Sequence, residues 1–197
     1  MKTLLSELKT SLLLTLVFAG LLCGAYPLAV WAGAQALFAD KANGSLVMDK
    51  DGTVRGSRLL AQNFGSAKYF QPRPSAAGTG YDAANSSGTN LGPTSQKLAD
   101  SIKAAVAAYR AANGLAADAA VPADAVTSSG SGLDPHISPA NAFLQAARVA
   151  KARGLPLEKV QAMITANTDG RDLGALGEAG VNILALNVAL DRTPASQ

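Results

Sequence analysis

SLLLTLVFAGLLCGAYPLAVWAGAQALFA, residues 11–39, runs for 29 positions without a charged side chain. As an α-helix it would be about 43 Å long at ~1.5 Å per residue, and the hydrocarbon core of a bilayer is only ~30 Å thick. We therefore expect a tilted transmembrane helix over residues 11–38. Around it we expect an N-terminal tail over 1–10, a connector over 39–55 and one folded domain over 56–197.

Two processing signals are weighed against a retained helix. Ala34-Gln35-Ala36 is typical of a signal-peptide cleavage site, but the apolar core of a signal peptide is about 7–15 residues long, which is shorter than this stretch. A lipoprotein would need a small residue before Cys23, and Leu22 stands there. A retained membrane helix is the interpretation that fits both observations.

The side of the membrane on which the domain lies is predicted from charge and cysteine usage. Lys2 and Lys9 precede the apolar stretch, whereas Lys41 and Lys50 follow it, a weak bias for a cytoplasmic N-terminus. Cys23 is the single cysteine of the chain, so the domain has none, which suits an oxidising compartment. We expect the domain to be extracytoplasmic.

Composition argues against several functional classes. The 17 basic and 14 acidic residues give a net charge of +3 without a basic run, so no nucleic-acid surface is expected. The single histidine and the absence of cysteine from the domain argue against a zinc site. The sequence also has no G-x-x-x-x-G-K-[ST] motif, which argues against a chain that hydrolyses ATP by itself.

The domain is predicted to be α+β and helix-rich in its C-terminal half. Short strands are expected at 46–48 and 53–55, with strand-like pieces at 57–64 and 68–70. Residues 75–95, rich in glycine and poor in large apolar side chains, are expected to form an ordered loop that contacts a partner. Helices are expected over residues 95–112, 139–153, from Pro156 onward, and over 182–190, although a strand is an alternative for the last.

Local signals set the ends and faces of these helices. Thr94 is the expected N-cap of the first helix, and Asn113-Gly114 its end. Ser138 followed by Pro139 is a typical start for the second. The side chains expected to face the core are Leu98, Ile102, Ala105, Val106 and Tyr109 in the first helix, Phe143, Leu144 and Ala147 in the second, Leu157, Val160 and Ile164 in the third, and Ile183, Leu186 and Leu190 in the fourth.

SSGSGLDPHISP, residues 128–139, has the residue types of a hydrolase triad in Ser131, Asp134 and His136. Nearness in sequence does not bring a nucleophile and its base together in space, and the G-x-S-x-G elbow is missing. We therefore interpret the segment as a turn and helix cap, and expect no catalytic residue. A membrane-tethered hydrolase using Ser131 and His136 stays open as the alternative.

The apolar stretch also contains a helix-packing pattern. Gly20 and Gly24 form a G-x-x-x-G motif, which lets a neighbouring helix approach closely. Pro27 would kink the helix unless a neighbour supports it. Together these three residues predict a helix that packs against other membrane helices.

Several segments, in this order after a single apolar span, closely resemble a known family. They are GSRLLAQNF, YDAANSSGTNLGPTS, SSGSGLDPHISPANA, RVAKARGL and VNILALNVALD. The chain resembles the C subunit of the Kdp-type potassium-transporting P-type ATPase over about residues 12–192. One departure is Ala146-Ala147, where the family usually has an aliphatic residue followed by proline.

The resemblance implies an accessory, non-catalytic subunit of a bacterial inner-membrane pump. Its partners would be a potassium-conducting subunit and an ATP-hydrolysing subunit, with membrane lipid around the helix. The family is described as assembling the complex and as a catalytic chaperone that raises the ATP affinity of the hydrolytic subunit. No cofactor is expected to bind tightly, and ATP is implied by resemblance alone, with Gln145 as the nucleotide-linked residue. The candidate partner contacts are Tyr69, Arg73, Tyr81, Asp82, Asn85, Asn90, Asp134, His136 and Arg148.

The predicted topology conflicts with direct nucleotide binding. An extracytoplasmic domain cannot reach cytoplasmic ATP, so any effect on ATP affinity would have to pass through the membrane helices as a coupling free energy. A stand-alone ligand-binding module, functional as residues 40–197 without a partner, is the remaining alternative.

Overall fold

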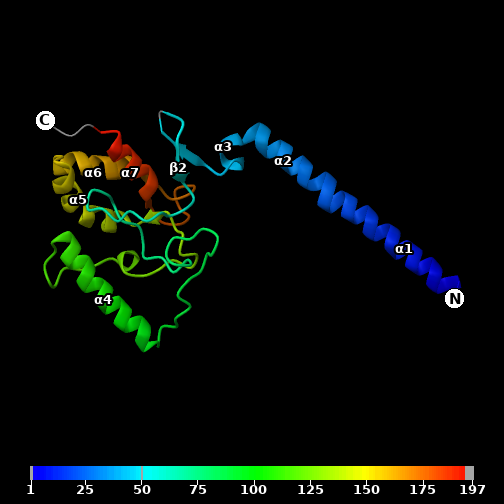
Figure 1. Ribbon diagram of the computed structural model, residues 1–197, viewed down its shortest axis with the longest axis horizontal. Helices are drawn as coiled ribbons and strands as arrows, with labels where there is room; N and C mark the ends of the chain where they lie inside the picture. The colour runs from blue at the N-terminus through cyan, green and yellow to red at the C-terminus, as the bar shows by residue number, and fades with distance from the viewer. Residues whose placement is uncertain (1, 50, 194–197) are drawn as a thin grey trace. The chain divides into compact units, whose positions relative to one another are not determined.

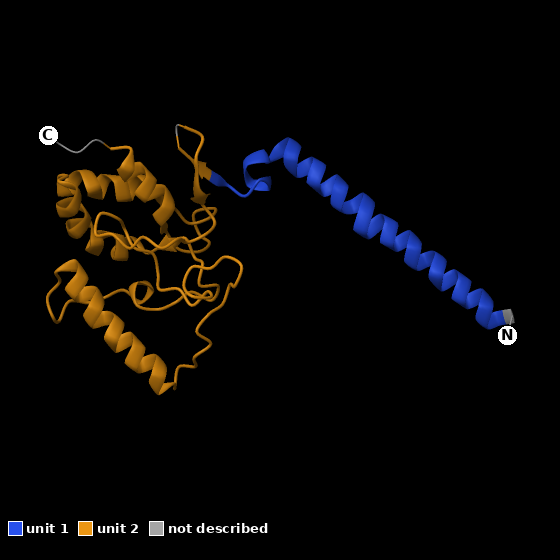
Figure 2. Ribbon diagram, in the orientation of Figure 1, with its two compact units in different colours: residues 1–46 blue, residues 47–197 orange. Residues whose placement is uncertain are grey.

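The computed structural model describes residues 2–49 and 51–193. Figure 1 traces a long N-terminal helix, then a domain of helices, short strands and long loops. The chain divides after Leu46 into two compact units, which Figure 2 shows in different colours. Each unit is described by itself.

The first unit is dominated by one continuous helix. It consists of α1 (Lys2–Ala19), a π-helical turn η1 (Gly20–Ala25) and α2 (Tyr26–Leu37). Among the described residues, this is the one helix long and apolar enough to cross a membrane, over Thr3–Leu37. This agrees with the expected N-terminal membrane helix, although helical backbone begins at Lys2 instead of residue 11.

The π-helical turn accommodates Pro27. A proline has no N–H to donate and its ring clashes with the carbonyl four residues earlier, here that of Cys23. The N–H of Tyr26 instead bonds the carbonyl of Leu21, five residues back, so the helix is widened where the proline enters. Gly20 and Gly24 both lie in this turn, and a Cβ added at either would meet nothing within 4 Å.

The connector holds a short helix and a two-stranded sheet. Helix α3 spans Ala39–Ala42, and strands β1 (Leu46–Met48) and β2 (Val54–Ser57) pair with one another. The two expected short strands are thus present. The strand-like pieces expected at 57–64 and 68–70 are wrong, because the described backbone after Ser57 forms no strand there.

Within the described residues, the domain has four α-helices, as expected. They are α4 (Gln96–Asn113), α5 (Pro139–Arg153), α6 (Leu157–Ala166) and α7 (Ile183–Asp191), with a 3-10 turn η2 at Ala123–Ala125. The predicted α+β class is therefore correct as a mixture of helices with small sheets.

The capping residues agree with the sequence signals except at one helix. The hydroxyl of Ser95, and not of Thr94, accepts the N–H of Leu98 at the start of α4. At α5 the hydroxyl of Ser138 accepts the N–H of Asn141 at 3.1 Å, as predicted. Gly154 ends α5 in the left-handed conformation, at φ 64°.

Helix α5 presents a different face to the core from the one predicted. Ala142, Ala146 and Val149 are fully buried, whereas Phe143 is 43% exposed and Ala147 is exposed. The face of small residues allows close packing, so the larger Phe143 is turned outward. The helix is uninterrupted through Ala146-Ala147.

The predicted faces of the other helices are confirmed in part. In α6, Val160 and Ile164 are buried but Leu157 is 38% exposed. In α7, Ile183 and Leu186 are buried, and Leu190 with them. The inward face of α4 is only half-buried along its length.

The core is completed by a small antiparallel sheet with strand order β3-β5-β4. The strands are β3 (His136–Ile137), β4 (Thr168–Asp169) and β5 (Gly180–Asn182). In the central strand, Val181 is fully buried and pairs with Ile137 on one side and with Thr168 on the other. The apolar cluster combines β3 and β5 with α5, α6 and α7 and two loop residues, Phe70 and Leu155. Its larger members also include Ile137, Val149, Val160, Ile164, Val181, Ile183, Leu186 and Leu190.

The long loop over residues 75–95 closes on the turn at 128–134. Ser87 N–H donates to the carbonyl of Ser131 at 3.0 Å, and the hydroxyl of Ser75 donates to the carbonyl of Gly132 at 2.7 Å. Gly132 has φ 68°, and a Cβ there would lie 2.6 Å from the carbonyl oxygen of Ser87. The two segments approach so closely that only glycine fits.

We predict that Gly132→Ala lowers the free energy of unfolding by about 2 kcal/mol or more, because a Cβ meets backbone atoms and φ is positive. Gly130→Ala is the matched control, since a Cβ there meets nothing within 4 Å. Its expected effect is within about 0.5 kcal/mol. Denaturant unfolding of the full chain in detergent, followed by circular dichroism, measures both. Equal effects of the two substitutions would contradict the close approach.

Candidate functional site

Two consecutive backbone positions, Phe70 and Gln71, are held by buried side-chain amides. Asn187 accepts the N–H of Phe70 and donates to its carbonyl, both at 2.9 Å. Gln145 accepts the N–H of Gln71 at 2.8 Å and donates to its carbonyl at 3.1 Å. Each amide thus makes the two bonds that a neighbouring strand would make. We call this arrangement the amide clamp.

Gln145 has no hydrogen-bonding capacity left over. A glutamine amide offers two acceptor positions and two donors. Besides Gln71, its oxygen accepts from Arg148 at 2.7 Å, and its nitrogen donates to Asn141 at 2.9 Å. The residue is also 1% exposed. A ligand would therefore reach Gln145 only by replacing one of these internal bonds.

Arg148 extends the clamp along the chain. Its guanidinium donates to the carbonyls of Ala67 at 2.7 Å and Tyr69 at 3.0 Å, and to the side chain of Asn113 at 2.9 Å. Burial lowers the pKa of Arg148. Arg148 thus ties residues 67–71 to the end of α4.

Tyr109 and Asp124 complete this polar layer. The hydroxyl of Tyr109 donates to Asn141 at 2.8 Å, and burial, aided by the charge of Asp124, raises the pKa of that hydroxyl. Asp124 accepts from the N–H of Ser138 at 2.7 Å and from the side chain of Asn141 at 3.0 Å. The start of α5 is therefore fixed from the loop that precedes it.

The segment at 128–139 does not assemble a triad. The ring of His136 lies 3.1 Å from a carboxylate oxygen of Asp169 and 3.9 Å from one of Asp134. The hydroxyl of Ser131 instead accepts the N–H of Leu133 at 3.1 Å and lies 3.4 Å from that of Ser129. None of these contacts joins Ser131 to His136, so the pair has no nucleophile-and-base geometry.

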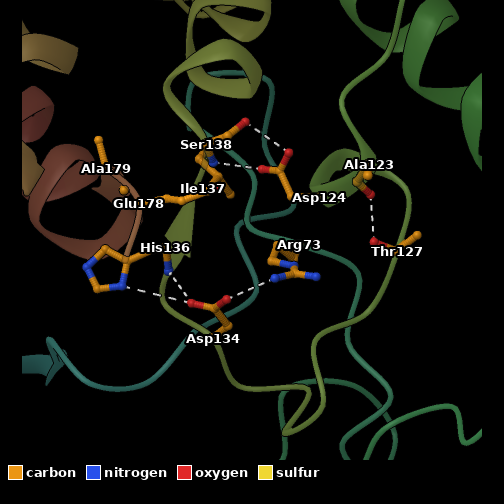
Figure 3. A pocket seen from close by; sticks show the side chains of 11 residues that line it. Arg73, Ala123, Asp124, Thr127, Asp134, His136, Ile137, Ser138, Glu178 and Ala179 are labelled. Atoms are coloured by element: carbon orange, nitrogen blue, oxygen red, sulfur yellow. Dashed lines mark hydrogen bonds and ion pairs between the residues drawn. The ribbon is translucent and has the colours of Figure 1, made fainter. Parts of the chain in front are cut away.

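A pocket of about 400 Å³ lies beside the same segment. Figure 3 shows Arg73, Asp134 and His136 on one side of it, with Asp124 and Ser138 across from them. The guanidinium of Arg73 pairs with Asp134 at 3.1 Å. Among the described residues, no group of three His, Cys, Asp or Glu side chains could hold a metal ion. The pocket is lined by three carboxylates, those of Asp124, Asp134 and Glu178, and by one guanidinium, that of Arg73.

The remaining sequence-predicted contact residues lie in two places. Tyr69 is half-buried, donates to Asp191 at 3.1 Å and lies under the guanidinium of Arg153, 4.9 Å from its ring centre. Tyr81 donates to the carbonyl of Arg73 at 2.9 Å. Both side chains hold loops of their own domain.

The asparagine-rich loop has the most accessible of the predicted contacts. Asn85 is exposed and donates to Asp82 at 2.7 Å; this bond and the N–H of Ala84 lower the pKa of Asp82. Asn90 is exposed and adopts φ 53°. These side chains face solvent and stay candidates for contact with a partner.

Sequence reasoning missed most of the buried amides. Asn141, Asn182 and Asn187 are each at most 2% exposed. Asn187 has a recognisable signal, because it interrupts the apolar run NILALNVAL next to the inward-facing Leu186. No pattern in the sequence around Asp124 indicates that its carboxylate bonds the start of α5.

The described structure is that of a mixed α+β domain preceded by one candidate membrane helix. A family model described as "K+-transporting ATPase, c chain" matches residues 8–192. The chain therefore belongs to the KdpC family, which confirms the resemblance noted from its sequence motifs.

Curated relatives support this assignment over nearly the full chain. Three of them, each named "Potassium-transporting ATPase KdpC subunit", come from Mycobacterium tuberculosis (strain H37Rv), Nitratidesulfovibrio vulgaris and Myxococcus xanthus. They are 54%, 53% and 55% identical to this chain. The alignments cover 94%, 95% and 96% of it and 98%, 95% and 88% of the relatives.

We predict that Gln145→Met lowers the free energy of unfolding by about 3 kcal/mol, because the partly buried backbone groups of Gln71 and the guanidinium of Arg148 lose their partner. Gln71→Ala is the matched control, since it removes an exposed side chain but keeps the clamped backbone. It should change stability by about 0.5 kcal/mol or less. Denaturant titration of the full chain measures both. A Gln145→Met variant as stable as the control would refute the structural role.

Proposed function

We propose that this chain is a non-catalytic accessory subunit that assembles and stabilises a potassium-transporting ATPase. The observation that carries the proposal is the family match over residues 8–192, together with relatives that are named as subunits of that ATPase. Its partners are then a potassium-conducting subunit and an ATP-hydrolysing subunit, with lipid around the apolar helix.

The geometry supports an accessory role over the hydrolase alternative. Ser131 and His136 make separate sets of contacts, and the polar side chains at the domain's centre bind its own backbone. A hydrolase needs a nucleophile within hydrogen-bond reach of its base. Positioning loops for contact with another protein is the use of these residues that the geometry favours.

The proposed location is a bacterial inner membrane, with the N-terminus cytoplasmic and the main domain, residues 56–197, extracytoplasmic. The support is the lysine bias around the apolar helix and the lack of cysteine after Cys23.

We predict that Asp100→Cys, in a Cys23→Ser background, reacts with a membrane-impermeant maleimide in intact spheroplasts. Asp100 is exposed on α4, so a cysteine there can react with any reagent that is present on the same side of the membrane. Lys9→Cys, in α1 just before the uncharged stretch that begins at Ser11, is the control and should react only after permeabilisation. Labelling of Lys9→Cys alone in intact spheroplasts would show the opposite topology.

The effect on ATP affinity proposed for the family is indirect in this account. Gln145 is buried and fully bonded, and the proposed topology puts the domain on the side away from cytoplasmic ATP. The coupling is therefore proposed to run through the membrane helices, with Gly20 and Gly24 at the contact.

We predict that Gly20→Leu combined with Gly24→Leu reduces co-purification of the other pump subunits. In the complex that remains, we expect the KM for ATP to rise between about 5- and 150-fold, the usual range of allosteric coupling. Gly33→Leu is the matched control, because Gly33 lies in α2 with equally open space around it. Normal assembly and an unchanged KM for ATP in the double variant would contradict coupling through packing of the membrane helix. Full function of residues 40–197 alone would favour the ligand-binding module.

A further inference from the structure

The loop between β4 and β5 exposes two leucines at its tip. Leu173 is 94% exposed and Leu176 is 60% exposed. Leu173 is the most exposed large apolar side chain among the described residues. We call residues 171–178 the hairpin tip. An isolated exposed leucine is ordinary on a protein surface, so exposure alone does not indicate a binding site. The backbone conformation of Leu173 and the charges near it provide further evidence.

The backbone at Leu173 is strained. Its φ of 52° lies in the left-handed region, which glycine and asparagine adopt readily and a leucine does not. Gly174 follows at φ 76°. A Leu at this position costs stability, and at 94% exposure it gains little packing within the chain. Strain of this kind is frequent at sites of interaction.

The hairpin tip is held in a defined shape. Asp172 and Leu176 exchange two backbone hydrogen bonds, each 2.9 Å long. At its base, Asp169 pairs with Gly180, and Thr168 with the fully buried Val181. The leucines are therefore presented on an anchored arm instead of a loose loop.

The hairpin tip has one exposed arginine, Arg171, and two exposed carboxylates, Asp172 and Glu178, so its net charge is negative. Glu178 is exposed and makes no hydrogen bond or ion pair with any residue that the structure describes. Glu178 and Ala179 line the pocket that also holds Asp124, Asp134 and His136, as Figure 3 shows. The cation of that pocket, Arg73, is already paired with Asp134.

This acidic setting disfavours a membrane surface. Anionic lipid headgroups attract lysine and arginine and repel carboxylates. An apolar tip with a net negative charge, beside a pocket that holds more carboxylates than cations, is complementary to an apolar pocket with a basic rim, which is a protein surface. The charge pattern therefore selects a protein as the occupant.

We propose that the hairpin tip docks, through Leu173 and Leu176, into an apolar pocket with a basic rim on another subunit of the same pump. Glu178 faces the basic rim. This inference rests on the proposed function, because it takes the partner to be a subunit of the assembled ATPase.

The test is Leu173→Asn in the full chain, co-expressed with the other subunits. Asparagine tolerates the left-handed backbone, so the melting temperature of the purified chain should rise by about 2 °C. The apolar contact is lost, so the affinity for the other subunits in detergent should fall about tenfold or more. A structural role alone would not move stability and assembly in opposite directions.

Leu157→Asn is the matched control, since Leu157 is also partly exposed but lies on α6 with ordinary helical backbone. It should leave assembly unchanged. Unchanged assembly with Leu173→Asn, or an equal loss with Leu157→Asn, overturns the proposal.

Glu178→Lys separates the protein partner from lipid. Opposite a basic rim the added cation should weaken assembly, whereas on anionic liposomes it would strengthen attachment. Stronger liposome attachment by Glu178→Lys, with assembly in detergent unchanged, would make lipid the occupant and overturn the proposal. Omitting the whole chain tests the proposed function separately: if the pump needs the chain but tolerates Leu173→Asn, only the docking inference fails.

Discussion

The amide clamp on Phe70 and Gln71 is the interaction on which the rest of the domain depends. The two backbone groups of Phe70 are buried there, and each would cost about 1–3 kcal/mol if left unpaired, whereas the two of Gln71 are partly buried. Asn187 from α7 and Gln145 from α5 pair all four. The clamp therefore fixes one segment against two helices at once, and it allows the side chain of Phe70 to be fully buried in the core.

The segments on both sides of the amide clamp are also held by side-chain contacts. Toward the N-terminus, Arg148 holds the carbonyls of residues 67 and 69. Toward the C-terminus, Arg73 is brought to Asp134, and Ser75 to the turn at Gly132. The long loop after residue 75 closes on that turn. A domain with short strands and long loops thus obtains a fixed surface from side-chain amides instead of an extended sheet.

The sequence predicted those parts of the fold that depend on local signals. The apolar stretch at 11–39, the cap at Ser138 and the end of α5 at Gly154 are each determined by residues close together in the chain. The strand expected at 68–70 was wrong because its backbone partners are side chains more than 70 residues away. Phe143 was misplaced because the small residues of α5, and not its largest one, pack against the core.

The candidate site was predicted less well than the fold, for a related reason. The motif SSGSGLDPHISP was identified, and its turn and cap chemistry agrees with the structure. The unpaired Glu178 and the strained Leu173 carry no local sequence signal, since their significance comes from exposure and backbone conformation. Buried asparagines are detectable only once it is known which helix face is inward.

Amide hydrogen exchange of the full chain tests the central claim most directly. The clamp predicts that the N–H groups of Phe70 and Gln71, although outside any helix or strand, exchange as slowly as that of Val149 in the buried face of α5. Exchange of Phe70 and Gln71 at the rate of the exposed loop around Gly65 would contradict it.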